Sequence, residues 1–569
     1  MTDHRNPFTS EEQPSMADLL YMIEKDMSLD PARQNNVACS VRRLCHFLNI
    51  DVGAAPAHPG YYRKKLSDLS PQRLGVSKTR LGNIKADVRW AFNQYIKADG
   101  QNTYLTPLSE DWRALSASLG GGRLAWTLSR FMRYCSAQGI KPGDVSDEVS
   151  SSFLQALTEE TFVDNPKDLH RRSCKAWNKA VDTVPDWPQV RLTRPSYRTT
   201  YTLPWPAFPD TLRADIDRWK DRLRGVDLLA EHGLDRPLAE RTIETRDFQL
   251  RQLASALVHQ GMGPHEITSL GVMTELSNTR LALKFFLDRS DNKPTVQIAQ
   301  LAHLLRSIAK YHLEASSEVI AEYSRLVNRL TPERHGMTDK NRDKLRQFED
   351  PQNVHALLEY PSTAVRRLDG EKQKTRSQAV QCQIALAVEM LLMMPIRMGN
   401  LVSLNIETHL HRSRGKGDEV HLVIPGEEVK NKEPLEFRFP VETLSLLDLY
   451  LKEYRPLLLD QPSSWLFPGR GGAHKVRSVL SNQISRHIQK ATGLNVNPHL
   501  FRHLAAKLYL DENPGGYEVV RRLLAHRSMQ TTINAYAGLE TKSAAAHFDQ
   551  TILDIRDALR NQVKEIEDA

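Results

Sequence analysis

The most informative stretch for the fold is Asn497-Pro498-His499-Leu500-Phe501-Arg502-His503, in the last third of the 569-residue chain. Asn497 is a favourable N-cap and Pro498 suits the first helical position, so we expect a helix to begin here. His499 and Arg502 are three residues apart and therefore share one face of its first turn. The free N–H groups and the positive dipole end of a helix favour an anion at the same place. The stretch therefore predicts a helix whose first turn can bind a negatively charged group.

A second candidate for binding an anion precedes this helix in the chain. The very apolar segment Ile384–Met394 is a predicted helix, and Pro395 ends it. Arg397 therefore lies at a turn between two helices. Taken alone, an arginine at such a turn is usually a solvated or capping residue.

The clearest β signal in the sequence is a hairpin between these two motifs. His421–Pro425 and Leu435–Pro440 are predicted strands, and Gly426–Pro434 joins them. The joining segment contains Val-Lys-Asn-Lys, so Lys430 and Lys432 are expected near the tip of the hairpin.

A histidine and a tyrosine follow the predicted His-x-x-Arg helix. His526 ends the string LLAH, and Tyr536 ends TTINAY. Either residue alone would most often be a packed, hydrogen-bonded residue. The order of the motifs is more specific, because an arginine, a lysine hairpin, His-x-x-Arg, a histidine and a tyrosine succeed one another.

The strings PIRMGNLVSL, VKNKEP, PHLFRH, LLAH and TTINAY, in this order, resemble the catalytic domain of the tyrosine recombinases, the phage integrase family. The resemblance covers about Phe348–Thr541, and the helical block around Thr242–Leu330 is similar to the family's core-binding domain. It implies a C-shaped clamp on double-stranded DNA, which is cleaved and rejoined through a 3′-phosphotyrosine. It also implies a homo-oligomer, with four protomers on two DNA sites.

The resemblance implies one role for each matching residue: Tyr536 is the nucleophile, Arg397 and Arg502 the arginine pair, His499 and His526 the two histidines, and Lys430 the hairpin lysine. Lys432 is a rival for the last role. Two guanidiniums can hold the phosphate oxygens bidentately, an imidazole can move a proton near neutral pH, and a lysine can protonate the departing 5′-oxygen. We expect no cofactor and no metal, since no acidic cluster at metal-ligand spacing occurs in the sequence.

The sequence departs from the family's pattern at several points. Asn400 stands where an acidic residue is frequent, and Ala525 stands where glycine is usual. The gap from His526 to the matching tyrosine is ten residues, one longer than the commonest spacing, which affects the loop before the nucleophile. Tyr509 and Tyr517 are alternative hydroxyls, but both precede His526 and break the order of the motifs.

Composition bounds the class of protein. The chain has 77 Lys plus Arg against 69 Asp plus Glu, and this net charge of +8 is too dilute to indicate nucleic acid by itself. No apolar stretch reaches the 18 residues of a membrane helix, and Met1–Ser15 lacks the apolar region of a secretory signal. The five cysteines form no CxxC pair, so they predict neither a disulfide framework nor a zinc site. We expect a reduced, cytoplasmic protein associated with the nucleoid and not with a membrane.

The predicted fold is mainly α and multi-domain, with helical N-terminal and core-binding modules before a mostly helical catalytic domain that contains a small β-sheet. Changes of pattern along the chain set the expected boundaries. We expect a disordered tail at 1–15, a helical module at 16–100, a second helical module, with a core-binding-like module as an alternative, at 101–184, and a Pro- and aromatic-rich connector with a helix at 185–236. The core-binding domain at 237–330, a linker at 331–347 and the catalytic domain with a C-terminal helix at 348–569 follow.

Two of the helical blocks contain a similar string. At an offset of 122 residues, Phe131–Ser146 lies over Leu253–Thr268 and matches Gly139 with Gly261. A helix that ends at glycine, a proline-containing turn and a new helix would produce this string. Either the second block is a duplicated module, or a common helix-stop pattern has arisen twice.

A one-sided helix is predicted at the C-terminus, since apolar residues recur at helical spacing: Phe548, Ile552, Ile555, Leu559, Val563 and Ile566. This face can pack on its own domain. Following the resemblance, it can instead dock on a neighbouring subunit and couple assembly to activity.

The sequence therefore predicts a metal- and ATP-independent DNA strand transferase, a site-specific recombinase that integrates or excises a mobile element. Two alternatives remain open. The chain could be a catalytically idle DNA-binding or architectural protein of the same fold. It could also be a DNA-relaxing enzyme like the type IB topoisomerases. A metal-dependent transposase or nuclease is disfavoured.

Overall fold

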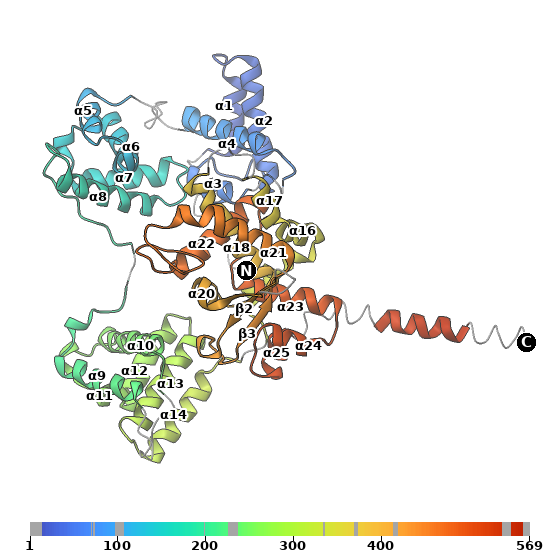
Figure 1. The fold of residues 1–569 in the computed structure, drawn as a ribbon. Coiled ribbons are helices and arrows are strands. Elements are labelled where there is room, and N and C mark those ends of the chain that lie inside the picture. The colour runs from blue at the N-terminus through green and yellow to red at the C-terminus, as the bar shows by residue number, and fades with distance from the viewer. Residues whose placement is uncertain are drawn as a thin grey trace, which may run out of the picture. The chain divides into compact units, whose positions relative to one another are not determined.

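The structure is a computed structural model. It describes residues 14–69, 71, 74–96, 107–197, 200–225, 237–333, 336–368, 374–413, 419–536 and 548–560. The fold is mainly helical with one small antiparallel sheet (Figure 1), which confirms the predicted fold class. The chain divides into two compact units: Met1–Arg194 with His335–Ala569 forms unit 1, and Pro195–Arg334 forms unit 2.

The first module of unit 1 is a small helical domain with its own apolar core. The core side chains come from one side of each helix and include Leu19, Val41, Tyr62 and Val88. Its helices are α1 (Met16–Lys25), α2 (Pro31–Leu48), α3 (Pro59–Asp68) and α4 (Lys78–Ala91).

The second module of unit 1 forms around a cluster of aromatic rings. The buried Trp177 ring lies 5.8 Å from the Phe131 ring and 5.1 Å from the Trp187 ring, measured between centroids. Trp187 and Leu192 belong to this core, although they lie in the predicted connector. The helices of the module are α5 (Glu110–Ser118), α6 (Gly122–Ala137), α7 (Asp147–Glu160) and α8 (Pro166–Thr183).

Unit 2 is an all-helical domain that begins earlier than the predicted core-binding domain. Phe208 and the apolar side of α9 are part of its buried core. The predicted connector 185–236 is therefore divided, because its aromatic side chains pack on the modules at either end. The helices of unit 2 are α9 (Asp210–Arg224), α10 (Glu240–His259), α11 (Leu270–Thr274), α12 (Leu276–Asp288), α13 (Val296–Tyr311) and α14 (Ser317–Leu330).

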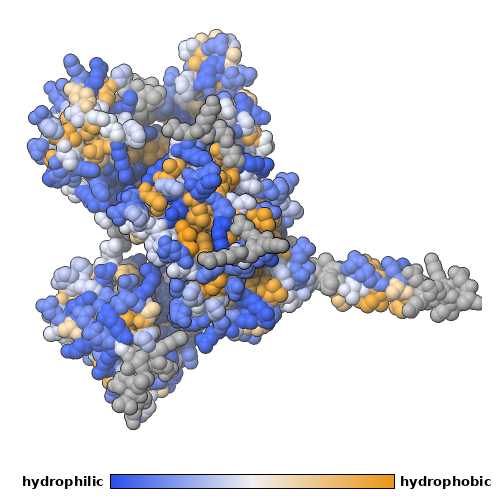
Figure 2. Space-filling model, viewed as in Figure 1, coloured by the Kyte–Doolittle hydropathy of each residue, from blue (hydrophilic) through white to orange (hydrophobic). Residues whose placement is uncertain are grey.

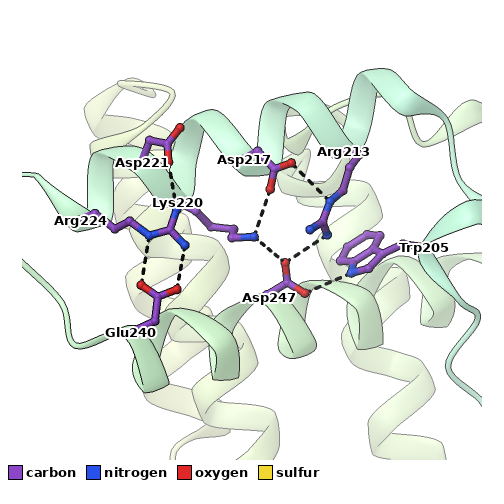
Figure 3. A network of polar contacts seen from close by, with 8 residues as sticks. All are labelled: Trp205, Arg213, Asp217, Lys220, Asp221, Arg224, Glu240 and Asp247. Atoms are coloured by element: carbon purple, nitrogen blue, oxygen red, sulfur yellow. Dashed lines mark hydrogen bonds and ion pairs between the residues drawn. The ribbon is translucent and has the colours of Figure 1, made fainter.

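A polar network joins α9 to α10 on the surface of unit 2 (Figure 3). The Asp247 carboxylate on α10 accepts hydrogen bonds from Trp205 Nε1 at 3.1 Å, from Arg213 at 3.2 Å and from Lys220 at 3.2 Å. Lys220 and Asp247 are largely buried, so this carboxylate fixes the position of α9 more firmly than an exposed ion pair would.

The C-terminal domain, residues 336–536, forms around α18. This helix is apolar on nearly all sides and buried, which is typical of a helix at the centre of a domain. The helices of the domain are α15 (Asp339–Arg346), α16 (Pro351–Leu358), α17 (Tyr360–Arg366), α18 (Arg376–Met393), α19 (Met398–Val402), α20 (Ile406–His409), α21 (Val441–Leu449), α22 (Arg477–Thr492), α23 (Leu500–Glu512), α24 (Tyr517–Leu523) and α25 (Met529–Tyr536).

The predicted hairpin is present and has a third strand beside it. β2 (Val420–Ile424) pairs antiparallel with β3 (Leu435–Arg438), and Ile424 lies opposite Leu435. β1 (Leu410–Arg412) pairs with the other edge of β2 and was not predicted, because three residues carry too short a pattern to be recognised.

The predicted linker 331–347 is wrong in its second half. Met337, Leu345 and Phe348 are buried in the core of the C-terminal domain, and α15 packs on α23. The charged residues of α15 face solvent, and this exposed face made the segment resemble a linker.

The repeated string has the same local structure in both places. Gly139 and Gly261 have positive φ angles of 68° and 102°. In each case the next residue closes the helix, with Ile140 N–H donating to Cys135 O at 2.9 Å and Met262 N–H to Leu257 O at 3.1 Å. A 3-10 turn follows each, at Pro142–Asp144 and Pro264–Glu266. The helices of the two modules therefore follow in the same order. In this order α6 corresponds to α10, α7 corresponds to α11 together with α12, and α8 corresponds to α13.

Residues 548–560 are helical, as predicted. The apolar side chains are exposed and gather on one side of this helix (Figure 2), with Phe548 64 % and Leu559 56 % exposed. Val563 and Ile566 lie outside the described residues. Within the described ranges, no helix combines the length and the apolar character needed to cross a bilayer.

Candidate active site

Arg502 joins three of the motifs through its guanidinium. It lies in the first turn of α23 and is 5 % exposed. Nη1 donates to Pro395 O at 2.6 Å, and Nη2 donates to Leu524 O at 2.6 Å. The turn that carries Arg397 and the loop that carries His526 are therefore both held by this one side chain. Burial and the nearby Arg397 charge lower the pKa of Arg502 to about 10, so it stays charged at neutral pH.

The helix that carries Arg502 begins later than predicted. Pro498 and His499 form a turn, which the Leu500 N–H closes by donating to Asn497 O at 2.9 Å and to Asn497 Oδ1 at 3.1 Å. α23 then begins at Leu500, with His499 in the N-cap position. Asn497 therefore caps the turn before the helix instead of the helix itself.

Arg397 lies at the turn between α18 and α19, as predicted. It is half-buried, and within the described part of the chain its guanidinium has no hydrogen-bond or ion-pair partner. Burial lowers its pKa, and the interaction with Tyr536 acts in the opposite direction. A half-buried guanidinium without a protein partner can bind an incoming anion.

Tyr536 lies among histidines at the end of α25. Its ring is stacked on the His526 ring, with 6.2 Å between centroids and 3° between planes, and it meets the His503 ring edge-on at 5.7 Å. The side chain is 2 % exposed. Burial raises the pKa of Tyr536 to about 12, although the charges of Arg502 and Arg397 oppose that rise. Loss of the phenolic proton near neutral pH therefore requires a base.

The histidines of the site are neutral at physiological pH. Burial and the charges of Arg502 and Arg397 lower the pKa of His526 to about 4. The pKa of the exposed His499 is also lowered, by the surrounding protein atoms and the same two arginines. The Nδ1 atom of His526 lies 3.0 Å from the hydroxyl of the buried Thr532, which fixes the ring beside Tyr536. A neutral imidazole in this position can accept a proton.

His503 is a residue of the site that the sequence interpretation missed. Its ring lies between His499, at 4.8 Å, and Tyr536, at 5.7 Å. Burial and the neighbouring charges lower its pKa to about 4, and its buried Nδ1 has no partner among the described residues. His503 follows His499 by four residues and so shares its helix face, a spacing that could have identified it.

The hairpin tip reaches the His526 loop through Asn431. The Asn431 side chain donates to Ala525 O at 2.5 Å. Lys432 has a positive φ of 61°, and its amine donates to Glu427 O at 3.1 Å. Lys430 is exposed, and its amine has no partner among the described residues. Of the two candidate lysines, Lys430 is thus the one whose amine is available to a ligand.

Asn400 and His409 hold the other side of the tip. The buried Asn400 side chain donates to Glu428 O at 3.0 Å. The buried His409 ring approaches the Glu428 carboxylate at 3.3 Å. The amide at position 400, where an acidic residue is frequent in the family, therefore has a structural partner, because a carboxylate could not donate this hydrogen bond.

Ala525 is the second departure from the family's pattern, and its backbone explains why glycine suits the position. Its φ is 45°, in the left-handed region that is strained for residues with a Cβ. Tyr509 and Tyr517, the alternative hydroxyls, pack against the hydrophobic core of the domain. The structure thus brings together Arg397, His499, Arg502, His526 and Tyr536, with Lys430 on the adjoining hairpin.

In the part of the chain covered by the structure, no group of three or more His, Cys, Asp or Glu side chains lies close enough to hold a metal ion.

Unit 2 has a basic cavity of its own, with a volume of about 670 Å³ between α10, α13 and α14. Four of its lining residues are Arg246, His303, Arg306 and Lys310, and no acidic side chain of the described residues lines it. The Arg246 Nε is buried without a partner among the described residues, and burial lowers the pKa of this guanidinium. The cavity therefore favours an anionic ligand.

Comparison with known proteins gives matches among solved structures only. No family model and no curated protein matches the chain. The chain is similar to the XerA recombinase (18 % identity, 60 % of this chain and 98 % of that one, TM-score 0.25) and to the XerH site-specific recombinase bound to its difH substrate (16 %, 53 % and 79 %, TM-score 0.34). It is also similar to a lambda integrase tetramer bound to a Holliday junction (14 %, 57 % and 76 %, TM-score 0.34).

These proteins are recombinases and integrases, the class that the ordered motifs resemble.

Proposed function

We propose that the chain is a tyrosine recombinase that cleaves and rejoins double-stranded DNA through a 3′-phosphotyrosyl intermediate. One observation carries the proposal: Tyr536 is stacked on a neutral histidine in the field of two arginines. These groups come from motifs far apart in the sequence, and packing of the core alone would not require a charged pair beside a tyrosine. The integration or excision of a mobile element is the corresponding biological use.

In the proposed reaction, the Tyr536 oxygen attacks the phosphorus and the bond from phosphorus to the 5′-oxygen breaks. Arg397 and Arg502 stabilise the charge on the non-bridging oxygens, a kind of stabilisation that contributes on the order of 3–4 kcal/mol per donor. A neutral histidine, His526 or His499, accepts the phenolic proton. Lys430 protonates the departing 5′-oxygen. Attack by a 5′-hydroxyl reverses every step, so the reaction needs no ATP.

Unit 2 is the proposed core-binding domain, and its basic cavity supports this role. Arg246, Arg306 and Lys310 line a cavity with no carboxylate among the described residues, which is suited to the phosphate backbone of DNA. We further propose a homotetramer on two DNA sites, with the helix at 548–560 docked on a neighbouring subunit, in a nucleoid-associated protein.

The test is covalent capture of DNA by the full chain. Purified protein is incubated with genomic DNA and denatured, and the protein–DNA adducts are isolated and sequenced. We expect adducts with the wild-type protein and none with Tyr536→Phe, which retains the ring and should still bind DNA. Tyr509→Phe and Tyr517→Phe are matched controls that should leave adduct formation unchanged.

Each other outcome favours a different function. Adducts that persist in Tyr536→Phe would refute this nucleophile. DNA binding without any adduct in the wild-type protein would favour the idle architectural protein. Relaxed circles without recombinant products, formed from supercoiled plasmids that carry two copies of the captured sequence, would favour the topoisomerase-like enzyme.

A further inference from the structure

Helix α8 of the second module exposes a continuous row of positive charges. Between Pro166 and Ala180, every exposed residue is a lysine or an arginine: Lys167, Arg171, Arg172, Lys175 and Lys179. These positions follow the helical repeat and so lie along one side of the helix. At 1.5 Å per residue the row is about 18 Å long.

The positive charge of this row is only partly compensated. Asp168 is the one carboxylate between Pro166 and Ala180, and it pairs with Arg171 at 2.5 Å and with Arg172 at 2.9 Å. Asp182, in the last turn of α8, is exposed on the same side and pairs with Arg191, which lies outside the helix. Lys175 and Lys179 have no ion-pair partner in the part of the chain that the structure describes. Between Pro166 and Ala180, five cations and one carboxylate leave a net charge of +4. By contrast, the +8 of the whole chain is spread over 569 residues.

The opposite side of α8 is anchored in the core of the module. The Trp177 indole N–H donates to Val190 O at 2.7 Å. The Asn178 side chain bonds to the backbone of Leu192 in both directions, at 2.7 and 2.8 Å. The backbone that carries the cations is therefore fixed before any partner binds, which lowers the entropy cost of binding.

The corresponding helix of unit 2 has a similar character. α13 occupies the place of α8 in the repeated order of elements, and it contains no acidic residue. Its side chains His303, Arg306 and Lys310 line the basic cavity. Both modules thus present cations from the helix at this position.

We propose that α8 is an additional surface for the backbone of duplex DNA, separate from the active site and independent of base sequence. A duplex carries one negative charge per about 1.7 Å of its axis, so the row can meet several phosphates at once. Single-stranded nucleic acid is disfavoured, because the exposed part of this face has no aromatic ring for stacking on bases. A membrane is disfavoured, because the face exposes no apolar side chain to insert. The proposal goes beyond cleavage at Tyr536. It rests on one part of the proposed function, namely that the chain acts on DNA.

The test measures binding of the full chain to a mixed-sequence duplex of about 40 bp over a range of salt concentrations. In Lys175→Gln with Lys179→Gln, we expect weaker binding and a salt-dependence slope smaller by about 1.8, or about 0.9 for each lost phosphate contact. Lys175→Arg with Lys179→Arg keeps the charges and should keep the slope. Arg42→Gln with Arg43→Gln removes the same charge from an exposed part of α2, next to Glu24, and should change the slope much less.

Equal slopes for the α8 glutamine pair and the α2 pair would overturn the proposal. The proposal would also be overturned if the Lys175→Gln, Lys179→Gln variant lost more binding to duplex RNA of the same length, or to vesicles of anionic lipid, than to DNA. Covalent capture at Tyr536 is measured separately on the same variants. If the wild-type protein forms no covalent adduct with DNA, the proposed reaction is refuted, but the effect of the α8 lysines on DNA binding still supports the present proposal.

Discussion

At the scale of single residues, the environment of Tyr536, the proposed nucleophile, contains charges that the protein does not neutralise. Arg397 has no protein partner among the described residues, while Arg502 is held by two carbonyl oxygens. A bound phosphate would be the counter-ion of both. Burial, assisted by the charge of Arg502, lowers the pKa of His503 and of His526 to about 4, so the site has neutral imidazoles that can accept protons before DNA arrives.

The depressed histidine pKa values predict a loss of stability in acid. The unfolded chain binds protons at these histidines below pH 6.5, whereas the folded domain resists protonation until about pH 4. Stability is therefore fully present above pH 6.5 and falls as the pH decreases towards 4. His503→Gln removes one such group, so its melting temperature should fall less than that of the wild-type protein over this range. Parallel pH profiles of the two proteins in thermal melts would contradict the assignment.

A bound phosphate should raise the same pKa values, because a negative charge favours the imidazolium. The decrease in melting temperature between pH 6.5 and pH 4 should therefore be smaller in the presence of duplex DNA.

The strained residue Ala525 gives a second prediction at this scale. Replacement by glycine removes a Cβ from a left-handed conformation, which costs about 1–2 kcal/mol in residues other than glycine. Ala525→Gly should therefore slow hydrogen exchange in the loop before Tyr536. Ala535→Gly is the matched control, since it lies in the helix α25, where glycine destabilises by about 1 kcal/mol. Faster exchange in Ala525→Gly would show that the strain is absent.

At the scale of elements, the hairpin and the His526 loop form one assembly through the tip residue Asn431. Asn431→Ala removes the only described bond from this side chain to the loop. A lost hydrogen bond of this kind is worth about 1 kcal/mol, so the rate of covalent capture should fall about fivefold to tenfold with unchanged DNA affinity. Glu436→Gln, on the exposed side of β3, is the control and should leave the rate unchanged. An unaltered rate in Asn431→Ala would mean that Lys430 is positioned without this contact.

Local patterns were sufficient for the long elements and insufficient for the short ones. The β2–β3 hairpin and the helix at 548–560 were predictable, because alternation and helical spacing extend over enough residues. β1 has only three residues, too few to show an alternating pattern. In α15 most residues are charged and face solvent, so the burial of Leu345 in the core could not be recognised from the local pattern.

The candidate site divides in the same way. The ordered motifs predicted six of its residues, whereas His503, Thr532 and Asn431 act through contacts that only the folded chain creates. No pattern within one segment could have indicated the bond from Asn431 to Ala525, since 94 residues separate them.

At the scale of the whole molecule, the proposed docking of the helix at 548–560 on a neighbouring subunit can be tested through its exposed apolar side. Phe548, Ile552, Ile555 and Leu559 are all exposed, and burying one such side chain would contribute about 1.5–3 kcal/mol. A chain truncated after Ser543 should therefore bind a single DNA site normally, but should fail to assemble on DNA that carries two sites. Analytical ultracentrifugation of both complexes measures this.

A point variant separates loss of the apolar face from loss of the tail itself. Ile552→Ser with Ile555→Ser should reproduce the truncation, because it removes apolar area while keeping the chain length. Asp554→Asn changes a polar position of the same helix and should assemble like the wild-type protein. If the truncated chain assembles and captures DNA as well as the full chain, the exposed face has no role between subunits. If the truncated chain fails to assemble but the double serine variant assembles normally, assembly depends on residues after 543 other than the apolar face.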